Sequence, residues 1–490
     1  MTLDSIPLVS GAEPGIGGHA PLFDRDRFDL LHRITREVED LGRVRFPTRD
    51  IVFANSPRAI HELFVEKAKH FAKSPSVRGP LYPLAGEGLF TSEGELWRKQ
   101  RRMMSPVFHR AKIDALADVM VECAEHACAS WSDGGVVDIA HETTRIAMNV
   151  AGRTLFGMDT SDEADEIGRA LTVSLDWANY ALRATPVLLQ MEVRLALLRG
   201  ADRSNVLARP LNALAARLER PIMWPTKRNR KMQSAIALLD ARVQRMIDQR
   251  RASNAAQHDF LSHLLHARDD DGGAMSDKQL RDEILTIFIA GHETTATGLA
   301  WAMYSLARNP PLYARARATV DALGGRPPVV SDLESLEFLG CVFKESLRLY
   351  PPVYLMGRIA TTDTSLAGHA IPKHTVIVVS PLALHRRADL WTQPLRFDPD
   401  RFSSANAARQ PQDAYIPFGD GPRICIGAHF AQLEAPLVLA RLFQRADFKL
   451  ASDVPILPDN SATLRPRNGV PMNIRLRPAY AREVSSSLTT

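Results

Sequence analysis

Apolar side chains recur at helical spacing over most of this 490-residue chain, and strand-like runs are confined to a few places. A helical period over 28–41 is followed by two short alternating runs at 43–46 and 50–54, which predict a small sheet. From about residue 95 to about residue 310 the period is helical almost throughout. The pattern predicts a large helical body with minor sheet at one side.

Strand patterns return after this helical stretch. Alternation over 359–380 predicts more strands, and the tail 463–476 has the pattern of a further hairpin. Neither a glycine- and serine-rich linker nor an internal repeat divides the chain. We therefore expect a mainly α fold of the α+β class, with a flexible segment at 1–25, a single domain at 26–480 and a short tail at 481–490.

The longest predicted helix is also the best marked. Ser276 and Gln279 have the spacing of a capping box, and two prolines stop the helix about nine turns later. Its apolar part, 284–307, is long enough to span a bilayer, but a histidine and a glutamate near the middle are costly in lipid. We expect a buried central helix. A second capping box at 331–334 predicts another helix start.

Composition describes an ordinary globular protein with a mild positive charge. With 45% apolar and 24% charged residues, the chain can bury a large core. A net charge of +5 suits an acidic protein partner or a negatively charged membrane surface as readily as nucleic acid. Four cysteines form no disulfide framework, and the first residues lack the basic and apolar regions of a signal peptide. We expect a cytoplasmic protein with no transmembrane anchor and no nucleic-acid partner.

One cysteine, Cys425, lies in a loop suited to an ionised sulfur. Residues 418–427 read FGDGPRICIG and precede an apolar helical run. A cysteine just before a helix N-terminus lies near unpaired backbone N–H groups and the positive end of the helix dipole, which favours thiolate over thiol. Gly421 and Gly427 can take backbone angles closed to other residues, so the loop can turn tightly and its amides can reach the sulfur.

Few sites need a single thiolate. A zinc site takes paired cysteine and histidine ligands that this sequence lacks, and the local signatures of cysteine proteases are absent, although a distant histidine partner stays open. Haem iron, with one axial thiolate, fits. The spacing Phe418-x-x-Gly421-x-Arg423-x-Cys425-x-Gly427 resembles the haem-binding signature of the cytochrome P450 family, and the resemblance covers about residue 30 to about residue 480.

The resemblance implies the P450 fold and a haem b cofactor in a soluble, bacterial-type enzyme without a fused reductase. Cys425 would be the axial ligand of the iron. Haem also brings two propionates, which favour cations and N–H donors, and relatives place such ligands at several matching positions. The residues that we expect to contact the haem are Trp97, Arg101, Ala290, Arg358, Phe418, Arg423 and Gly427, with His385 as a further candidate.

The long helix carries the sequence Ala290-Gly291-His292-Glu293-Thr294-Thr295. A mid-helix glycine costs about 1 kcal/mol relative to alanine, and a flat cofactor against the helix would explain Gly291, because it leaves a gap for a diatomic ligand. Splitting dioxygen consumes two protons, which a hydroxyl and a neighbouring acid can relay. Thr294 and Glu293 resemble the family's acid–alcohol pair. The alternative is a polar patch in which Thr294 bonds back to the carbonyl four residues earlier.

A second charged motif is predicted to be structural. Glu345 and Arg348 share one helical face, and the family resemblance joins them to Arg401 in a buried network behind the thiolate loop. Three buried charges are tolerable only when all are paired.

The resemblance also implies electrons from a separate ferredoxin or flavodoxin-type donor, because no phosphate-binding glycine motif is present. A basic surface would receive it, formed by Arg98, Lys99, Arg101, Arg102, Lys112 and Lys344. Another basic run, 227–231, either touches a membrane surface or is a solvated helix start.

The expected activity is hydroxylation or epoxidation of an apolar substrate, such as a fatty acid, terpenoid or polyketide, with O2. The residues expected to line the pocket are Tyr82, Leu84, Leu188, Leu189, Val353, Leu355, Met356 and Ala462. Two rival functions are a peroxide-driven hydroxylase, which needs no proton relay, and a haem sensor without turnover.

Overall fold

The computed structural model describes residues 2–15, 17–157, 161–181, 184–203, 206–252, 259–269, 271–459 and 463–478. Its helices are α1 (Ala20–Arg25), α2 (Arg27–Glu37), α3 (Pro57–His61), α4 (Pro75–Ala85), α5 (Gly94–Met104), α6 (Arg110–Asp114), α7 (Ala117–Cys128), α8 (Ile139–Phe156), α9 (Ser161–Ala181), α10 (Thr185–Asp202), α11 (Ala208–Arg217), α12 (Lys227–Ala252), α13 (Phe260–His266), α14 (Asp277–Ala307), α15 (Pro310–Asp321), α16 (Glu337–Leu349), α17 (Pro381–Leu384) and α18 (Ala428–Arg445). Its strands are β1 (Leu41–Phe46), β2 (Arg49–Ala54), β3 (Phe71–Lys73), β4 (Val136–Asp138), β5 (Met356–Ala360), β6 (Thr364–Leu366), β7 (His369–Ile371), β8 (Val376–Val379), β9 (Ala446–Leu450) and β10 (Pro471–Leu476).

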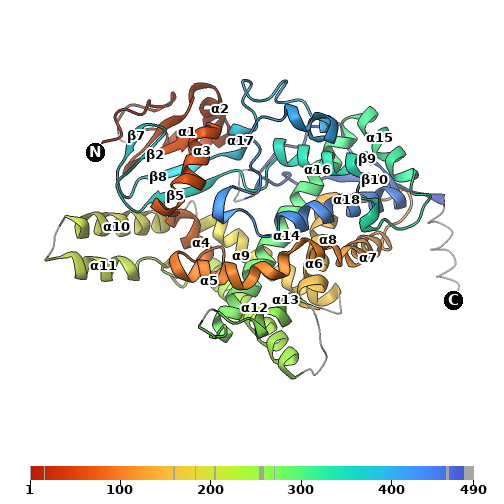
Figure 1. Cartoon of the computed structure of the whole chain (residues 1–490), viewed down its shortest axis with the longest axis horizontal. Helices are drawn as coiled ribbons and strands as arrows, with labels where there is room; N and C mark the ends of the chain where they lie inside the picture. Colours follow the sequence, from red (N-terminus) through yellow and green to blue (C-terminus); the bar gives the residue numbers. More distant parts are fainter. Residues whose placement is uncertain are drawn as a thin grey trace.

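Helices dominate the described chain and the strands form small sheets, so the predicted mainly α, α+β fold class is confirmed. The largest sheet has the order β1-β2-β8-β5-β3 and lies with the N-terminal helices at one side of the helical body (Figure 1). Strands β2 and β8 pair in parallel, and the other neighbours in this sheet are antiparallel. The sheet therefore joins the N-terminal strands to the strands near residue 360, as a platform beside the helices.

Helix α14 crosses the interior of the molecule. Its start is the predicted capping box: the Gln279 N–H donates to Ser276 Oγ (3.3 Å) and the Ser276 N–H donates to Gln279 Oε1 (3.0 Å). The helix ends at Ala307, before the two prolines that open α15. Most of its side chains are buried, which confirms a central helix of the fold. Within the described chain, no helix is long and apolar enough to cross a membrane.

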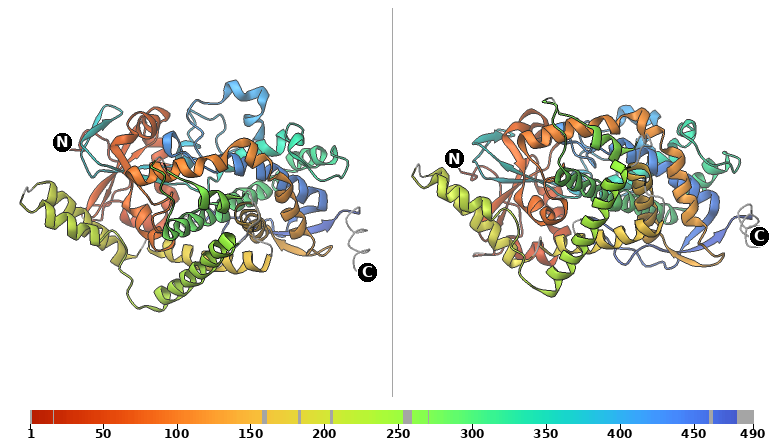
Figure 2. Two further views of the ribbon diagram at one scale, coloured as in Figure 1. Left: turned by 60° about the horizontal axis from the view of Figure 1, so that its bottom comes forward. Right: turned by 90° about the horizontal axis from the view of Figure 1, so that it is seen from below.

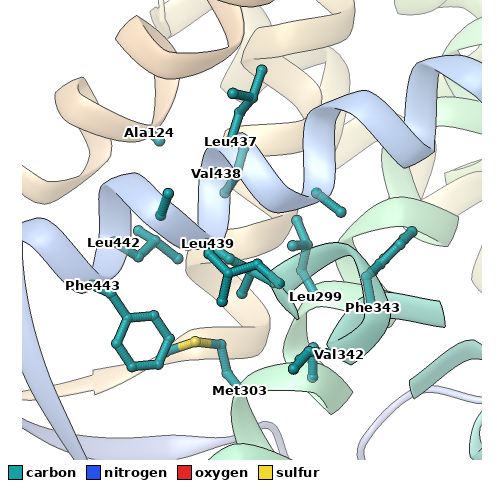
Figure 3. Packing of buried hydrophobic residues seen from close by; sticks show 14 of the residues in the cluster. Ala124, Leu299, Met303, Val342, Phe343, Leu437, Val438, Leu439, Leu442 and Phe443 are labelled. Atoms are coloured by element: carbon teal, nitrogen blue, oxygen red, sulfur yellow. The ribbon is translucent and has the colours of Figure 1, made fainter. Parts of the chain in front are cut away.

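The main core joins α14 to the helix that follows Cys425. Leu299 and Met303 of α14, Val342 and Phe343 of α16, and Leu437, Val438, Leu439, Leu442 and Phe443 of α18 are buried in one cluster, which Figure 3 shows from close by. Burying each such side chain stabilises the fold by about 1.5–3 kcal/mol relative to exposure. This packing fixes the thiolate loop, which immediately precedes α18, relative to α14.

Two local predictions are wrong. The second capping box does not start a helix, because α16 begins at Glu337 and Asp332 instead binds Arg326 and the Val329 N–H in a short 3₁₀ turn. The tail is not a separate hairpin either: β10 pairs with β9 and β4, in the order β4-β10-β9. The partners of this strand come from distant parts of the sequence, which a local alternating pattern does not reveal.

Part of the N-terminal segment 1–25 packs against the sheet. Ile6 is fully buried, Val9 nearly so, and Leu8 forms a bridge with Arg43 at the edge of β1. Helix α1 then adds Leu22 to the same side of the fold. These apolar side chains hold the segment against the sheet. The predicted tail at 481–490 lies outside the described residues.

Helices α10 and α11 form a hairpin that reaches away from the body. Figures 1 and 2 both show it beyond the β-sheet side of the molecule. The basic run 227–231 opens α12, which returns the chain to the body against α9. The hairpin connects these two helices.

Candidate active site

The loop before α18 is shaped by one close backbone contact. Gly421 has φ +68°, and a β-carbon there would lie 2.0 Å from the Phe64 carbonyl oxygen, so only glycine fits. The Cys425 N–H donates to the Phe418 carbonyl (2.9 Å) and closes the loop. Gly427 was predicted to use a backbone angle closed to other residues, but its φ of −90° is open to any residue. Its contribution is its backbone N–H, which reaches the Cys425 thiol and lowers the pKa of that group.

Cys425 is the accessible thiol among the four cysteines. Cys123, Cys128 and Cys341 are buried, and burial raises the pKa of Cys123 and of Cys341 to about 11. The Cys425 sulfur is open to solvent yet surrounded by protein, since burial raises its pKa while the Gly427 amide and Arg101 lower it. An accessible sulfur deep in the fold can bind a large ligand.

The middle of α14 provides a second accessible surface. Ala290 is exposed in a helix whose other side chains are mostly buried, and Gly291 and Thr294 are partly exposed. The Thr294 hydroxyl donates to the Ala290 carbonyl (2.6 Å), the back-bond that sequence reasoning gave as the alternative. A β-carbon at Gly291 would only touch Ala151 at 3.6 Å, so packing alone does not require a glycine there.

Glu293 is held by residues of the C-terminal region. Thr463 Oγ1 donates to Glu293 Oε1 (2.6 Å), and Arg465 Nη1 lies 3.8 Å from the same oxygen. Burial raises the pKa of Glu293, and these two partners oppose that shift. Arg465 also pairs with Asp459 and Asp176 and is 40% exposed, so Glu293 connects the interior to a charged surface group.

The predicted network behind the thiolate loop is present. Arg348 donates to both oxygens of Glu345 (2.7 and 2.8 Å), and both side chains are fully buried. Arg401 Nε lies 3.4 Å from Glu345 Oε1, and the Asp398 N–H donates to that same oxygen (2.9 Å). Arg348 further donates to the carbonyls of His385 and Pro394. Each charge therefore has several partners, as a buried ionic group requires.

A group of buried cations surrounds a single carboxylate near the start of α5. Lys73, Arg358 and Arg423 influence one another, and Glu93 is the anion among them. Glu93 pairs with Arg423 and accepts the Lys73 backbone N–H. Burial and the neighbouring Arg423 lower the pKa of Arg358 to about 10. The surplus positive charge favours an anionic ligand.

Trp97 and Arg101 lie one turn apart on α5, beside this cation group. The Arg423 guanidinium lies over the Trp97 ring, 4.1 Å from its centre. Burial lowers the pKa of Arg101, and the Cys425 sulfur raises it, so its guanidinium faces the thiol. Within the described residues, the Arg101 guanidinium makes no ion pair.

His385 is not a haem ligand. Its Nδ1 lies 3.1 Å from the Arg348 carbonyl and its Nε2 accepts the Ile416 N–H (3.0 Å), so both ring nitrogens are occupied by backbone. The ring is fully buried, and burial lowers its pKa to about 3. It is a structural residue that joins α16 to the loop before Phe418.

Sequence reasoning missed the residues that hold the chain between α4 and α5. The Glu87 N–H donates to Asp282 and the Leu89 N–H to Glu283 (each 2.9 Å), both on α14. Lys73 Nζ donates to the Leu89 carbonyl (2.9 Å) and also to that of the next residue. The two residues of each bond are 16 to 195 positions apart, so local spacing could not predict these contacts. The one available signal was the acidic pair Asp282 and Glu283 near the start of a central helix.

The predicted pocket residues are only partly brought to accessible surface. Val353, Leu188 and Leu189 are exposed, while Leu84 is fully buried in the core. Tyr82 instead receives a hydrogen bond and a ring contact from a neighbouring arginine. Ala462 lies outside the described residues.

The predicted haem can be tested against these groups. A flat apolar macrocycle with an axial thiolate and two carboxylates needs an accessible sulfur, apolar surface and cations. Cys425 supplies the first, and exposed Ala290, Val353 and Ile424 supply the second. The cations are Arg101, which makes no ion pair in the described part of the chain, and the group Lys73, Arg358 and Arg423, which has a surplus of positive charge. The residues fit the cofactor.

Comparison with known proteins agrees with this geometry. A family model described as Cytochrome P450 matches residues 15–472. Cyclooctatin synthase of Streptomyces melanosporofaciens is 34% identical over 433 residues, which cover 88% of this chain and 87% of that protein. Pentalenene oxygenase of Streptomyces avermitilis is 29% identical over 474 residues (96% and 97%), and cyclooctat-9-en-7-ol 5-monooxygenase of Streptomyces melanosporofaciens is 32% identical over 444 residues (90% and 89%). The chain therefore belongs to the cytochrome P450 family, in which a cysteine holds the haem iron, and it is a monooxygenase of that family.

Proposed function

We infer that the substrate is a terpenoid, hydroxylated or epoxidised with O2. The relatives carry this inference, because two of them are named for oxygenation of the terpenoids pentalenene and cyclooctat-9-en-7-ol. Exposed apolar side chains support it, since Ala290, Val353 and Ile424 can offer apolar contacts to such a substrate. Fatty acids and polyketides remain the competing substrate classes.

We further propose roles for the site residues. Cys425 binds the iron, and haem supplies the oxygen-activating chemistry when bound. Glu293 carries protons inward, because its buried carboxyl favours the protonated form and Arg465 links it to the surface. Thr294 passes them on when its hydroxyl turns away from the Ala290 carbonyl. Gly291 keeps the adjacent helix face free of side chain.

The cations around Glu93 take the propionates in this proposal. Among the described residues, Arg101 and Arg358 form no ion pair with a carboxylate, while Arg423 already has Glu93 and lies on Trp97. Phe418 packs against the core cluster under the loop and supports the cofactor from that side. Charge-assisted bonds to carboxylates are about twice as strong as neutral ones, so these arginines contribute much of the haem affinity.

Electrons are proposed to come from a separate ferredoxin or flavodoxin in the cytoplasm. The predicted basic surface supports such a partner, although Glu95 pairs with Arg98 and Asp269 pairs with Lys99 and reduce its charge. Purified enzyme given NADPH, a reductase and either donor should oxidise a cyclic terpene. Product with hydrogen peroxide alone, and none with either donor, would favour the peroxide-driven alternative.

The substrate class can be tested by a spectral screen. Cyclic terpenes should displace the water on the iron and give the high-spin shift, while fatty acids of similar size should not. A Cys425→Ala variant should lack the carbon-monoxide band of thiolate-ligated haem, with Cys341→Ala as the matched control. Persistence of that band in Cys425→Ala would remove Cys425 as the ligand. Binding without NADPH-linked oxidation of any terpene would support the sensor alternative.

A further inference from the structure

The α4–α5 segment, residues 86–93, is held to the first turns of α14 by two buried carboxyl groups. The Glu87 N–H donates to Asp282 and the Leu89 N–H donates to Glu283 (each 2.9 Å). Asp282 is almost fully buried and Glu283 is fully buried. The segment contains neither helix nor strand, so these acids satisfy backbone groups that secondary structure would otherwise pair.

Two glycines let this segment lie directly on α14. Gly86 has φ +52°, and a β-carbon there would lie 2.2 Å from Asp282 Oδ1. At Gly88 a β-carbon would lie 2.1 Å from Thr286 Oγ1 and 2.5 Å from the Asp282 carbonyl oxygen. Contacts this short exclude a side chain at either position. The segment therefore has a defined seat on the helix rather than a loose contact with it.

Four consecutive carbonyl groups of the segment, those of residues 89–92, accept hydrogen bonds from cations. The donors are Lys73 to the first two carbonyls (2.9 Å for that of Leu89), Arg78 to the third (2.6 Å) and Arg423 to the fourth (3.4 Å). Hydrogen bonds from charged donors are about twice as strong as neutral ones, so these cations contribute much of the order of the segment. Leu89 is thus held at both backbone groups, at its N–H by Glu283 and at its carbonyl by Lys73.

The same cations belong to the group that we propose to bind the haem propionates. Burial lowers the pKa of Lys73 well below its usual range, and the neighbouring Arg423, Arg358 and Arg78 lower it further, while Glu93 opposes the shift. Repulsion within the group therefore disfavours the charged form of Lys73, which is the form that donates the stronger hydrogen bonds.

The charges of this group do not balance within the protein. In the part of the chain that the structure describes, two carboxylates form ion pairs with the four cations: Glu93 with Arg423, and Glu219 with Arg78. Lys73 and Arg358 form no ion pair there. The surplus of two positive charges equals the charge of the two propionates of a haem, so a bound haem would complete the pairing.

We propose that Lys73 and Glu283 are positioning residues of the haem site, which couple the order of the α4–α5 segment to the charge of the propionates. Propionate binding removes the repulsion on Lys73, so that Lys73 holds the Leu89 carbonyl more firmly while Glu283 holds the Leu89 N–H on α14. Because coupling is reciprocal, an ordered segment raises the haem affinity by the same factor. The coupling rests on the proposed propionate role of the cations and is independent of the substrate.

Changing the propionate charge tests the coupling directly. Full-length protein is loaded with haem or with iron protoporphyrin IX dimethyl ester, whose esterified propionates carry no charge, and amide hydrogen exchange is followed by mass spectrometry. We expect peptides that cover residues 86–93 to exchange about tenfold faster in the ester-loaded protein. Peptides that cover α16 (337–349) should exchange equally in both. Equal exchange of the 86–93 peptides in the two proteins would overturn the proposal.

Lys73→Met supplies the readout that a purely structural role would not change. The variant lacks the ammonium group, so its 86–93 peptides should exchange faster than wild type with haem, and the difference between haem and its ester should disappear. A difference as large as that of wild type would show that Lys73 does not sense the propionates and would overturn its role.

Glu283 tests the reciprocal effect from the far side of the segment. Glu283→Leu removes the acceptor of the Leu89 N–H and should speed haem loss about tenfold. Glu283→Gln keeps an oxygen at this position and is the conservative variant that should restore the wild-type rate. Transfer of haem to apomyoglobin measures both rates. Equal rates for the two variants would contradict the coupling.

Arg358→Gln separates the coupling from the propionate assignment. Arg358 donates to the Gly357 carbonyl (3.1 Å) and, within the described chain, to no carbonyl of the segment. If it binds a propionate, Arg358→Gln should speed haem loss about tenfold. An unchanged rate would reject the propionate role of this arginine and, with it, the charge balance behind the coupling. Faster haem loss together with equal exchange in the haem and ester proteins would keep the propionate role and overturn the coupling alone.

Discussion

The α16–α18 side of the molecule and the α10–α11 hairpin differ in how fully their charged side chains are paired. Behind the thiolate loop, Glu345 and Arg348 are fully buried and every hydrogen-bonding end is occupied. On the hairpin, both acids pair outside it, Glu192 with Arg49 and Asp202 with Lys373, and four of the five arginines form no ion pair within the described chain. The side that fixes the Cys425 loop pairs its own buried charges, whereas the hairpin leaves most of its arginines without an ion pair in the described chain.

The two regions also differ in packing. The α7, α14, α16 and α18 helices share one large buried cluster, whereas α10 contributes Leu195 to a small cluster against the sheet. Apolar burial dominates local stability, so the hairpin is expected to open at lower free energy than the core. We therefore expect the Cys425 loop to be more rigid than the hairpin.

Breaking the network behind the thiolate loop should have the largest effect. Glu345→Gln removes a buried negative charge and leaves Arg348 and Arg401 without it, which is expected to cost about 3–5 kcal/mol of unfolding free energy and to release haem. Urea unfolding followed by circular dichroism and by the haem band measures both. Glu334→Gln, at an exposed position shortly before α16, is the control and should match wild type. A Glu345→Gln protein that unfolds like the control would show that the network is dispensable.

The next prediction concerns the accessible face of α14 at Ala290 and Thr294. Thr294→Ala removes the hydroxyl proposed to pass protons, so product formed per NADPH should fall on the order of tenfold while substrate still binds. The neighbouring Thr295 is buried, and Thr295→Ala serves as the control. Measured peroxide release should rise in Thr294→Ala alone. Unchanged coupling would refute the relay and would leave the hydroxyl as a helix-bending group bonded to Ala290.

The Cys425 loop was far easier to predict from the sequence than the cation group around Glu93 and the segment between α4 and α5. The loop 418–427 is contiguous, so local spacing was enough to identify it, whereas the pair Glu345 and Arg348 gained its meaning only from the family resemblance. Lys73, Glu93 and Glu283 bind partners that are distant in the sequence. The Leu89 N–H, for example, donates to Glu283, which lies 194 positions later. The capping box predicted from spacing at 331–334 was also wrong, because Asp332 forms an ion pair with Arg326 and does not cap a helix.

Arg101 lies on α5, outside both regions, and its guanidinium faces the Cys425 thiol. Arg101→Ala should speed haem loss about 10- to 100-fold, because a charge-assisted bond to a propionate disappears. Transfer of haem to apomyoglobin measures the rate. Arg98→Ala on the same helix, where the exposed Arg98 pairs with Glu95, should leave it unchanged. Equal rates for the two variants would contradict the propionate role of Arg101.

The last expected effect concerns two buried acids, one on α14 and one on α18. Glu283 of α14 accepts a hydrogen bond from the Leu89 N–H, and Glu434 lies in α18. Burial raises the pKa of each of these carboxyl groups to about 8. The unfolded carboxyl has a pKa near 4.5. Between pH 4.5 and pH 8 the folded protein therefore keeps protons that the unfolded chain loses, and stability must fall as pH rises through this window.

Replacing either acid with glutamine removes its proton exchange and should flatten this fall by on the order of 1–3 kcal/mol. Urea unfolding at pH 5 and pH 8 measures the difference. Glu283→Gln retains an oxygen for the Leu89 N–H, so its effect should be confined to the pH dependence, as for Glu434→Gln, in which no described residue bonds to Oε1. A slope that changes with Glu434 alone would mean that Glu283 is ionised, and that the α4–α5 segment is held by a charge like those behind the thiolate loop.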